Sequence, residues 1–310
     1  MSTELSLWNE TPQKKAILDF VQAVTNKSDP HYVSPVERIA TFDNDGTLWC
    51  EKPMYIQLVH GLRGIGRMAA AKPEVRDRQP FKAVYEKDMV WLGKVAADYV
   101  KGDSTGFFTV ASGMAEAFAD IPTGEFEADA KEFLTNVQHD RFKVPYKQLT
   151  YKPMVQLLDY LQNNDFGVWI TSGGGRDFIR AVSEEIYGIS RSRTIGSSIT
   201  FKYAEDKNGV AQIVRNKEIE QPIDDGQGKP PHIHRAIGRR PIFAAGNSDG
   251  DIHMLKYAKA HEGLSFALLV HHDDAEREYA YGAGTEKALQ LAPGASWVVV
   301  SMKNDWKKIF

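Results

Sequence analysis

The chain has 310 residues, of which 42% are hydrophobic and 25% are charged, and its formal net charge is -3. These values are typical of a globular protein with one large domain or a core plus a second module. They exclude a general attraction to nucleic acid, and no stretch has the length of a membrane span. The single cysteine, Cys50, excludes an intramolecular disulfide. Because charged residues such as Lys14 and Lys15 interrupt the N-terminal segment, we expect no signal peptide, a cytoplasmic protein, and neither a membrane nor a nucleic acid as partner.

The first predicted helix begins at Thr11-Pro12, where Thr is suited to the N-cap and Pro to the first helical position. A polar connector leads to residues 38–48, within which an apolar, β-prone run ends at Asp43, Asn44 and Asp45. Ligands of parallel α/β sheets bind beyond the carboxyl ends of the strands, so Asp43 and Asp45 stand where we expect chemistry. The plain alternative is a strand followed by a polar turn.

Residues 53–150 carry almost no strand signal. Their apolar residues predict helices over 55–68, 81–100, 111–119 and 125–137, with Pro and Gly at the connections. A block of helices this long, inserted after one strand, favours a separate cap over the end of that strand. The alternative, helices that simply cover the sheet, fits less well with the short connections usual in compact domains.

The α/β pattern resumes at Pro153 with a helix and then a strand over 166–171. A helix over 176–187 follows, and strands over 194–203 and 210–214 flank an Asp-Lys-Asn-Gly turn that predicts a hairpin. Further strands are predicted over 241–245, 264–270 and 297–302. We therefore expect an α/β core formed by residues 1–52 and 151–310 and a helical cap formed by residues 53–150.

The acid pair predicts phosphoryl chemistry. One carboxylate can attack phosphorus to form an aspartyl phosphate, and a second can protonate the leaving oxygen and then deprotonate water. Two crowded anions facing an anionic substrate repel each other strongly, so this chemistry requires a divalent cation.

Three later segments complement the acid pair. Ser172 and Gly173 lie at a strand-to-helix junction, where a hydroxyl and backbone amides can bind phosphate. Lys229 precedes a proline suited to open a helix, and it could neutralise the nucleophile and the phosphoryl group. Residues 246–251 form an acidic loop after a strand, and its oxygens could complete a magnesium site. Taken singly, these segments could be a glycine-rich turn, an exposed lysine and a polar turn.

The order of these segments is more specific than any one of them. From about Arg38 to its end, the chain resembles the haloacid dehalogenase (HAD) superfamily, with the helical insert placed like the cap of phosphoserine phosphatase-like members. The resemblance implies a Rossmann-like, mostly parallel sheet flanked by helices, an inserted all-helical cap and Mg²⁺-dependent phosphoryl transfer. It also implies roles for matched residues: Asp43 as nucleophile, Asp45 as general acid/base, Thr47 as the end of the first motif, Ser172 as the phosphate-binding hydroxyl and Lys229 as the catalytic lysine.

The metal loop departs from the family pattern Gly-Asp-x-x-x-Asp. Asn247 stands at the first acid, and Asp251 keeps the second. An asparagine can still bind a cation through its side-chain oxygen, but with less charge, and Asp249 is a candidate to compensate. We expect Mg²⁺ to bind Asp43, the Asp45 carbonyl, Asn247 and Asp251.

Glu51 lies near the position where phosphoserine phosphatases place a substrate-contacting Glu, so the resemblance assigns it to the substrate. The sequence thus predicts a phosphatase that acts on a small phosphorylated metabolite. A phosphotransferase of the same fold and a non-catalytic protein that binds a phosphorylated ligand are the alternatives, and Asn247 is the reason for the second. The oligomeric state is not predicted.

Overall fold

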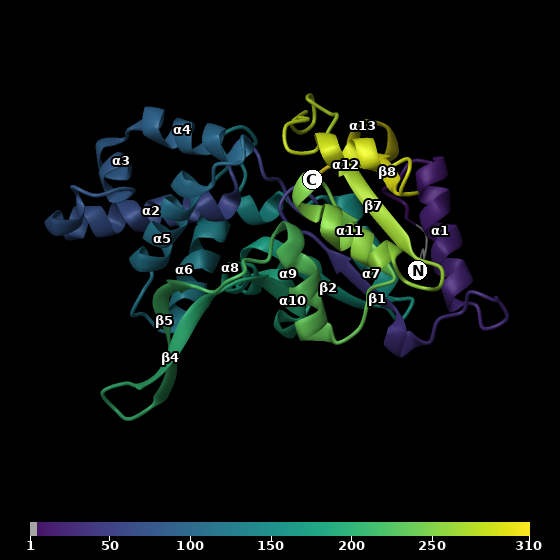
Figure 1. Cartoon of the computed structure of the whole chain (residues 1–310), viewed down its shortest axis with the longest axis horizontal. Helices are drawn as coiled ribbons and strands as arrows, with labels where there is room; N and C mark the ends of the chain where they lie inside the picture. The colour runs from purple at the N-terminus through teal and green to yellow at the C-terminus, as the bar shows by residue number, and fades with distance from the viewer. Residues whose placement is uncertain (1–4) are drawn as a thin grey trace.

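A computed structural model, which describes residues 5–310, contains a parallel sheet with the strand order β3-β2-β1-β6-β7-β8 (Figure 1). Its strands are β1 (Ile39–Phe42), β2 (Gly167–Gly175), β3 (Thr194–Ser197), β6 (Phe243–Gly246), β7 (Phe266–His271) and β8 (Val298–Ser301). The strand that carries the acid pair is therefore central. This arrangement confirms the predicted α/β fold with a Rossmann-like sheet.

Helices cover both faces of the sheet. Successive side chains of a strand point to opposite faces, so Phe243 and Ala245 belong to one hydrophobic cluster and Ala244 to the other. Helices α1 (Pro12–Thr25) and α7 (Lys152–Gln162) pack in the first cluster, and α10 (Lys229–Ile237), α11 (Ile252–Lys259) and α12 (Glu286–Leu291) pack in the second. The short α13 (Met302–Asp305) follows β8. Thr11 caps α1 and accepts a hydrogen bond from the Lys14 amide, as predicted.

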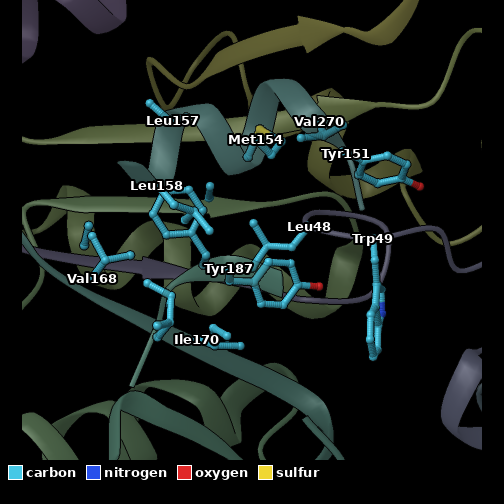
Figure 2. Close-up of a cluster of buried hydrophobic side chains, with 14 of the residues drawn as sticks. Leu48, Trp49, Tyr151, Met154, Leu157, Leu158, Val168, Ile170, Tyr187 and Val270 are labelled. Atoms are coloured by element: carbon cyan, nitrogen blue, oxygen red, sulfur yellow. The ribbon is translucent and has the colours of Figure 1, made fainter. Parts of the chain in front are cut away.

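The loop that follows β1 is anchored in the first cluster. Figure 2 shows Leu48 and Trp49 of this loop beside Tyr187, with Leu157 of α7 and Ile170 of β2 in the same cluster. These side chains are almost completely buried, and each such burial contributes roughly 1.5–3 kcal/mol. The packing therefore holds the loop between Asp43 and Leu48 in one conformation.

The inserted segment is helical, as predicted. It contains α2 (Ile56–Ala71), α3 (Phe81–Glu86), α4 (Met89–Val100), α5 (Thr105–Ala117) and α6 (Thr123–Asn136). The prediction of one helix over 81–100 was wrong, because Lys87 takes a left-handed conformation with φ 56° and Asp88 caps a new helix. These helices lie to one side of the sheet (Figure 1).

Two further predicted elements are divided in the structure. The helix expected over 176–187 is α8 (Arg176–Arg180) and α9 (Ser183–Tyr187), and the strand expected over 194–203 is shared between β3 and β4 (Ile199–Glu205). The predicted hairpin is present: β4 pairs antiparallel with β5 (Ala211–Ile219). It projects away from the main sheet and packs against α5 and α6 (Figure 1).

The division into a core of residues 1–52 and 151–310 and a cap of residues 53–150 remains a proposal, and residues 1–4 of that core lie outside the described part of the chain. The hairpin belongs to the proposed core by sequence and contacts the proposed cap in space. No helix within residues 5–310 is long and apolar enough to cross a membrane.

Candidate active site

The register of the sheet places three of the predicted motifs at one edge. Phe42, the last residue of β1, pairs with Ile170 of β2 on one side and with Ala245 of β6 on the other. The residues that follow these partners therefore meet Asp43 at the carboxyl edge. The Asp43 amide donates to the Ala245 carbonyl at 2.9 Å, which extends the sheet into the loop.

Lys229 joins the acid pair to the metal loop. Its Nζ donates to Asp43 Oδ1 and Asp251 Oδ1, each at 2.6 Å, and to the Thr171 carbonyl at 3.1 Å. All three charged groups are buried, with Lys229 and Asp251 each only 1% exposed. The lysine is placed by the start of α10, as the proline after it predicted. It is therefore not an exposed loop lysine.

The site carries an excess of negative charge. Burial and repulsion from Asp251 raise the pKa of Asp43 well above its usual range, against the attraction of Lys229. Burial also raises the pKa values of Asp45 and Glu51. The pKa of Lys229 is raised despite its burial, because Asp251 and Asp43 stabilise the ammonium. The Lys229 ammonium thus contacts two buried carboxylates with Asp45 close by, while Glu51 is paired with Lys52 at 3.8 Å, so a bound cation would lower the electrostatic cost.

Two hydrogen bonds hold the carboxylate of Asp45. Trp49 Nε1 donates to Asp45 Oδ1 at 2.9 Å, and Ser172 Oγ donates to Asp45 Oδ2 at 3.5 Å. Burial is the main reason for its raised pKa, so its protonated form persists to higher pH than that of an exposed aspartate. The second carboxylate of the predicted pair can therefore hold a proton at the site.

The backbone amides of the Ser172 motif, predicted to bind phosphate, already donate hydrogen bonds within the protein. Ser172 Oγ accepts from the Gly174 amide at 3.1 Å, and the Gly175 amide donates to Gln57 Oε1 of α2 at 2.6 Å. Both amides therefore already have partners within the protein. β2 also continues through this motif to Gly175, so the strand is longer than the pattern indicated.

Asn247 belongs to a polar network behind the acid pair. Its Oδ1 accepts from Thr47 Oγ1 at 3.1 Å, and its Nδ2 donates to Glu51 Oε1 at 3.3 Å. Tyr281 also donates to Glu51 Oε1, at 2.5 Å. At Gly46, φ is +77° and a Cβ would lie 2.1 Å from Asn247 Nδ2, so only glycine fits this turn.

The acidic loop presents Asp251 but turns Asp249 elsewhere. Asp251 Oδ2 accepts from the amides of Asn247 and Ser248 at 2.9 and 3.0 Å, which fixes the carboxylate at the edge of the sheet. Asp249 Oδ1 accepts from the Ala288 amide of α12 at 2.8 Å. Asp249 is therefore a structural link to α12, and Glu51 is the additional carboxylate beside Asn247.

The side chains suit a hard cation with oxygen ligands. Within residues 5–310 no three His, Cys, Asp or Glu side chains converge as a ready metal cluster. Magnesium, however, keeps several waters and needs only one or two protein carboxylates. Asp43 and Asp251 provide two carboxylates, and the main chain at Asp45 and the Asn247 side chain provide neutral oxygens. The residues present therefore fit Mg²⁺.

A cavity of about 240 Å³ opens over this site. Of the predicted site residues, seven line it: Asp43, Asp45, Glu51, Ser172, Gly173, Lys229 and Asp251. Thr47 and Asn247 lie behind this wall and contact Asp43 and Glu51. Sequence reasoning missed Asp225, which lines the cavity, and Asp224, which accepts from Thr171 Oγ1 at 3.0 Å. It also missed Trp49 as a hydrogen-bond donor to Asp45 and Tyr281 as a donor to Glu51. Trp49 stands four positions after Asp45, which is the one signal that could have suggested its role.

This fold and this site define a hydrolase of the haloacid dehalogenase type. The model of the family "haloacid dehalogenase-like hydrolase" matches residues 40–256, and the chain belongs to this family. The predicted membership of the superfamily is thereby confirmed.

Two solved structures share the fold. A conserved protein of unknown function from Anaerococcus prevotii is 15% identical, with a TM-score of 0.61 over 99% of this chain and 98% of that one. A protein of unknown function from Bordetella pertussis is 13% identical, with a TM-score of 0.54 over 85% of this chain and 98% of that one. Neither relative carries an activity that could be transferred.

One curated protein matches part of the sequence. A glucose-6-phosphate isomerase from Staphylococcus epidermidis is 29% identical over 171 residues, which are 52% of this chain and 36% of the isomerase. The match covers little more than a third of that protein's length, and it assigns no activity to this chain.

Proposed function

We propose that the protein is a Mg²⁺-dependent phosphatase that hydrolyses a small phosphomonoester through a phosphorylated Asp43. The observation that carries this proposal is the contact of Lys229 with both Asp43 and Asp251 at 2.6 Å, inside a cavity that Asp45 and Ser172 also line. Groups suited to act as nucleophile, acid and phosphate-binding cation thus line the same cavity.

In the first step Asp43 Oδ attacks phosphorus in line with the ester oxygen. Asp45 donates its proton to the departing alcohol, and the buried, tryptophan-bound carboxyl is suited to hold that proton. The ammonium of Lys229 and the hydroxyl of Ser172 stabilise the charge on the transferred group. In the second step Asp45, now a carboxylate, takes a proton from the water that releases phosphate.

Asp43, the Asp45 carbonyl, Asn247 and Asp251 would hold Mg²⁺. The ion would neutralise the crowded carboxylates and the phosphate, so that nucleophile and substrate can approach. The asparagine at the first position of the loop lowers the charge of this set. Glu51, which accepts from Asn247 Nδ2, restores a carboxylate next to it.

A comparison of wild type with Asp43→Asn tests the proposal. With 4-nitrophenyl phosphate and Mg²⁺ we expect turnover by the wild type, loss of turnover on chelation, and at least about 10³-fold lower kcat in the variant. Asn retains the shape of Asp, so circular dichroism should show a folded variant. Equal turnover by wild type and variant would refute the nucleophile.

The two alternatives have their own outcomes in the same assay. Phosphate transfer to added glycerol that exceeds release to water would identify a phosphotransferase. Binding of a phosphorylated ligand with no turnover above that of Asp43→Asn would identify a non-catalytic binding protein.

A further inference from the structure

The cavity over the active site has two chemically different ends. One end, the reaction end, holds Asp43, Asp45 and Lys229. The other, the insert end, is formed by the inserted helices and the hairpin. On α5, apolar residues recur three and four positions apart, which places them on one face of the helix. Together with Phe118, the C-cap of this helix, they line the cavity: Phe107, Val110, Ala111, Met114, Ala115 and Phe118.

Apolar side chains of other elements add to this stripe, although the polar Arg176, Ser197 and Ser198 also line the cavity. Phe126 of α6, Phe178 of α8, Ile199 of β4 and Ile219 of β5 line the cavity as well. The ring of Phe126 stands edge-on to that of Phe118 on the α5 stripe, with centroids 5.2 Å apart. An organic group that enters from the reaction end would therefore be surrounded by aromatic and aliphatic carbon.

Two basic side chains in this part of the wall have carboxylate partners, and the third, Arg176, donates to Ser198 Oγ at 2.9 Å and lies 3.7 Å from Asp177. Arg215 Nη1 donates to Asp177 at 3.1 Å, and the guanidinium lies 3.7 Å from the centre of the Phe126 ring. His60 bonds Asp129 at 2.6 Å. A substrate with its own ammonium or carboxylate would have to break these pairs or remain unpaired in an apolar site, and both are unfavourable. The apolar end thus selects against zwitterionic and polyhydroxylated alcohols.

We propose, on the basis of the proposed function, that the natural substrate is a phosphomonoester of an apolar alcohol about the size of one ring. Its organic group would lie against the α5 stripe, with its phosphate at Asp43. An apolar cavity of about 150 Å³ accommodates benzene. The cavity of about 240 Å³ therefore has room for a phosphate and a ring or a short alkyl chain.

A series of primary-alkyl phosphates tests this proposal, because the departing oxygen stays the same while the apolar area grows. We expect kcat/KM to rise about fourfold for each added methylene from ethyl to butyl phosphate and to remain high for hexyl and 2-phenylethyl phosphate. Phosphoserine and glycerol phosphate, also primary alcohols, should fall about 100-fold below 2-phenylethyl phosphate. A flat series, or a preference for the polar esters, would overturn the proposal.

A matched pair of variants on α5 locates the effect. Ala111 lines the cavity, and its neighbour Ser112 is exposed outside it. Ala111→Phe should lower kcat/KM for 2-phenylethyl phosphate at least about tenfold and for methyl phosphate less than about threefold. Ser112→Phe should change neither. Equal effects of Ala111→Phe on both substrates would contradict the proposed site for the organic group.

Binding of phosphonates separates this inference from the proposed activity, because phosphonates are not hydrolysed. Calorimetry should show hexylphosphonate binding at least about tenfold more tightly than 2-aminoethylphosphonate. If hexylphosphonate binds more tightly but no ester is hydrolysed, the proposed phosphatase activity is refuted and the proposed apolar class of ligand is supported. Turnover that depends on Asp43, with no apolar preference in either assay, would keep the phosphatase and refute the ligand class.

Discussion

The two ends of the cavity are built in opposite ways. At the reaction end the charged groups are held by several hydrogen bonds each: Lys229 contacts two carboxylates and a carbonyl, and Asp251 accepts from two amides. At the end near the insert, the α5 stripe presents half-buried side chains such as Phe107 and Met114 to open space. A rigid polar site suits one chemical step, and an adaptable apolar wall suits the choice of the group that leaves.

This difference predicts where substitutions act. A change at the reaction end should reduce kcat or alter its pH dependence. A change at the insert end should act mainly on KM and on the choice of substrate. Variants that reverse this assignment would show that the two ends are not separate.

Lys229→Met should have the largest effect. The substitution leaves Asp43 and Asp251 buried together without the ammonium that links them, which costs about 3–5 kcal/mol of stability, and it removes a cation from the phosphoryl group. We expect at least about 10³-fold lower kcat and a lower melting temperature.

Added Mg²⁺ sharpens this prediction. If the ion binds between the carboxylates, it should restore part of the melting temperature of Lys229→Met while kcat stays low. Lys259→Met, at a lysine that donates to the Ser265 carbonyl outside the site, serves as the control and should leave kcat unchanged. Near-normal turnover of Lys229→Met would contradict the assigned role.

Asp224→Asn tests a buried carboxyl beside the reaction end. We expect the pH-dependent part of the free energy of unfolding to change by about 2–4 kcal/mol, which is less than for Lys229→Met. Asp224 is fully buried and accepts from Thr171 Oγ1 at 3.0 Å, and burial raises its pKa to about 7. A raised folded-state pKa means that the folded protein binds this proton more tightly. The stabilisation is complete below the ordinary pKa near 4 and is lost as the pH rises through 7.

The measurement is the free energy of unfolding in urea from pH 4 to pH 8. Wild type should lose stability relative to Asp224→Asn as the pH rises through this window, and the difference should become constant above it. The slope is the readout, because Asn also changes the hydrogen bonding of a buried site. Parallel pH profiles would show that Asp224 is ionised in the folded protein throughout.

The sequence alone was sufficient to predict the site residues that lie at the ends of strands. Asp43, Ser172 and Asn247 each come directly after or within the end of a central strand, and parallel strands bring their ends to one edge. Lys229 was assigned from the order of the motifs and the family resemblance, because its place at a helix start fits an exposed lysine equally well. Local pattern and the family resemblance therefore gave most of the candidate site and most strands of the sheet, but not the order of the strands.

The rest depends on contacts that no local pattern contains. Tyr281 reaches Glu51 across 230 positions, and Arg215 reaches Phe118 across 97 positions. The helix expected over 81–100 breaks because Lys87 adopts a left-handed turn, although lysine carries no turn signal. The apolar stripe of α5 resembles an ordinary core face in the sequence. Only the arrangement of α5, α6 and the hairpin shows that it lines a cavity.

Trp49→Phe tests how Asp45 is held, with about tenfold lower kcat expected from lost orientation. The indole hydrogen bond holds down the pKa of Asp45, which burial raises. Without this donor the pKa should rise further, so the acid stays protonated and the alkaline limb of kcat/KM moves to higher pH. Trp169→Phe, in β2 and packed against the second cluster, should leave the limb in place. A limb that moves to lower pH would contradict the role of Asp45 as acid.

Arg215→Lys should have the smallest effect, and it tests the insert end directly. The guanidinium donates to Asp177 and to the Phe118 carbonyl while it lies over Phe126. Lysine keeps the charge, but its ammonium cannot contact the carboxylate, the carbonyl and the ring at the same time as a planar guanidinium does. The side chains of the aromatic wall should therefore be less well ordered. We expect KM for 2-phenylethyl phosphate to rise about fivefold, KM for methyl phosphate to stay within about twofold, and kcat for both to change little. A lower kcat at constant KM would instead place Arg215 among the groups that act on the phosphoryl transfer, because only an interaction made in the transition state produces that pattern.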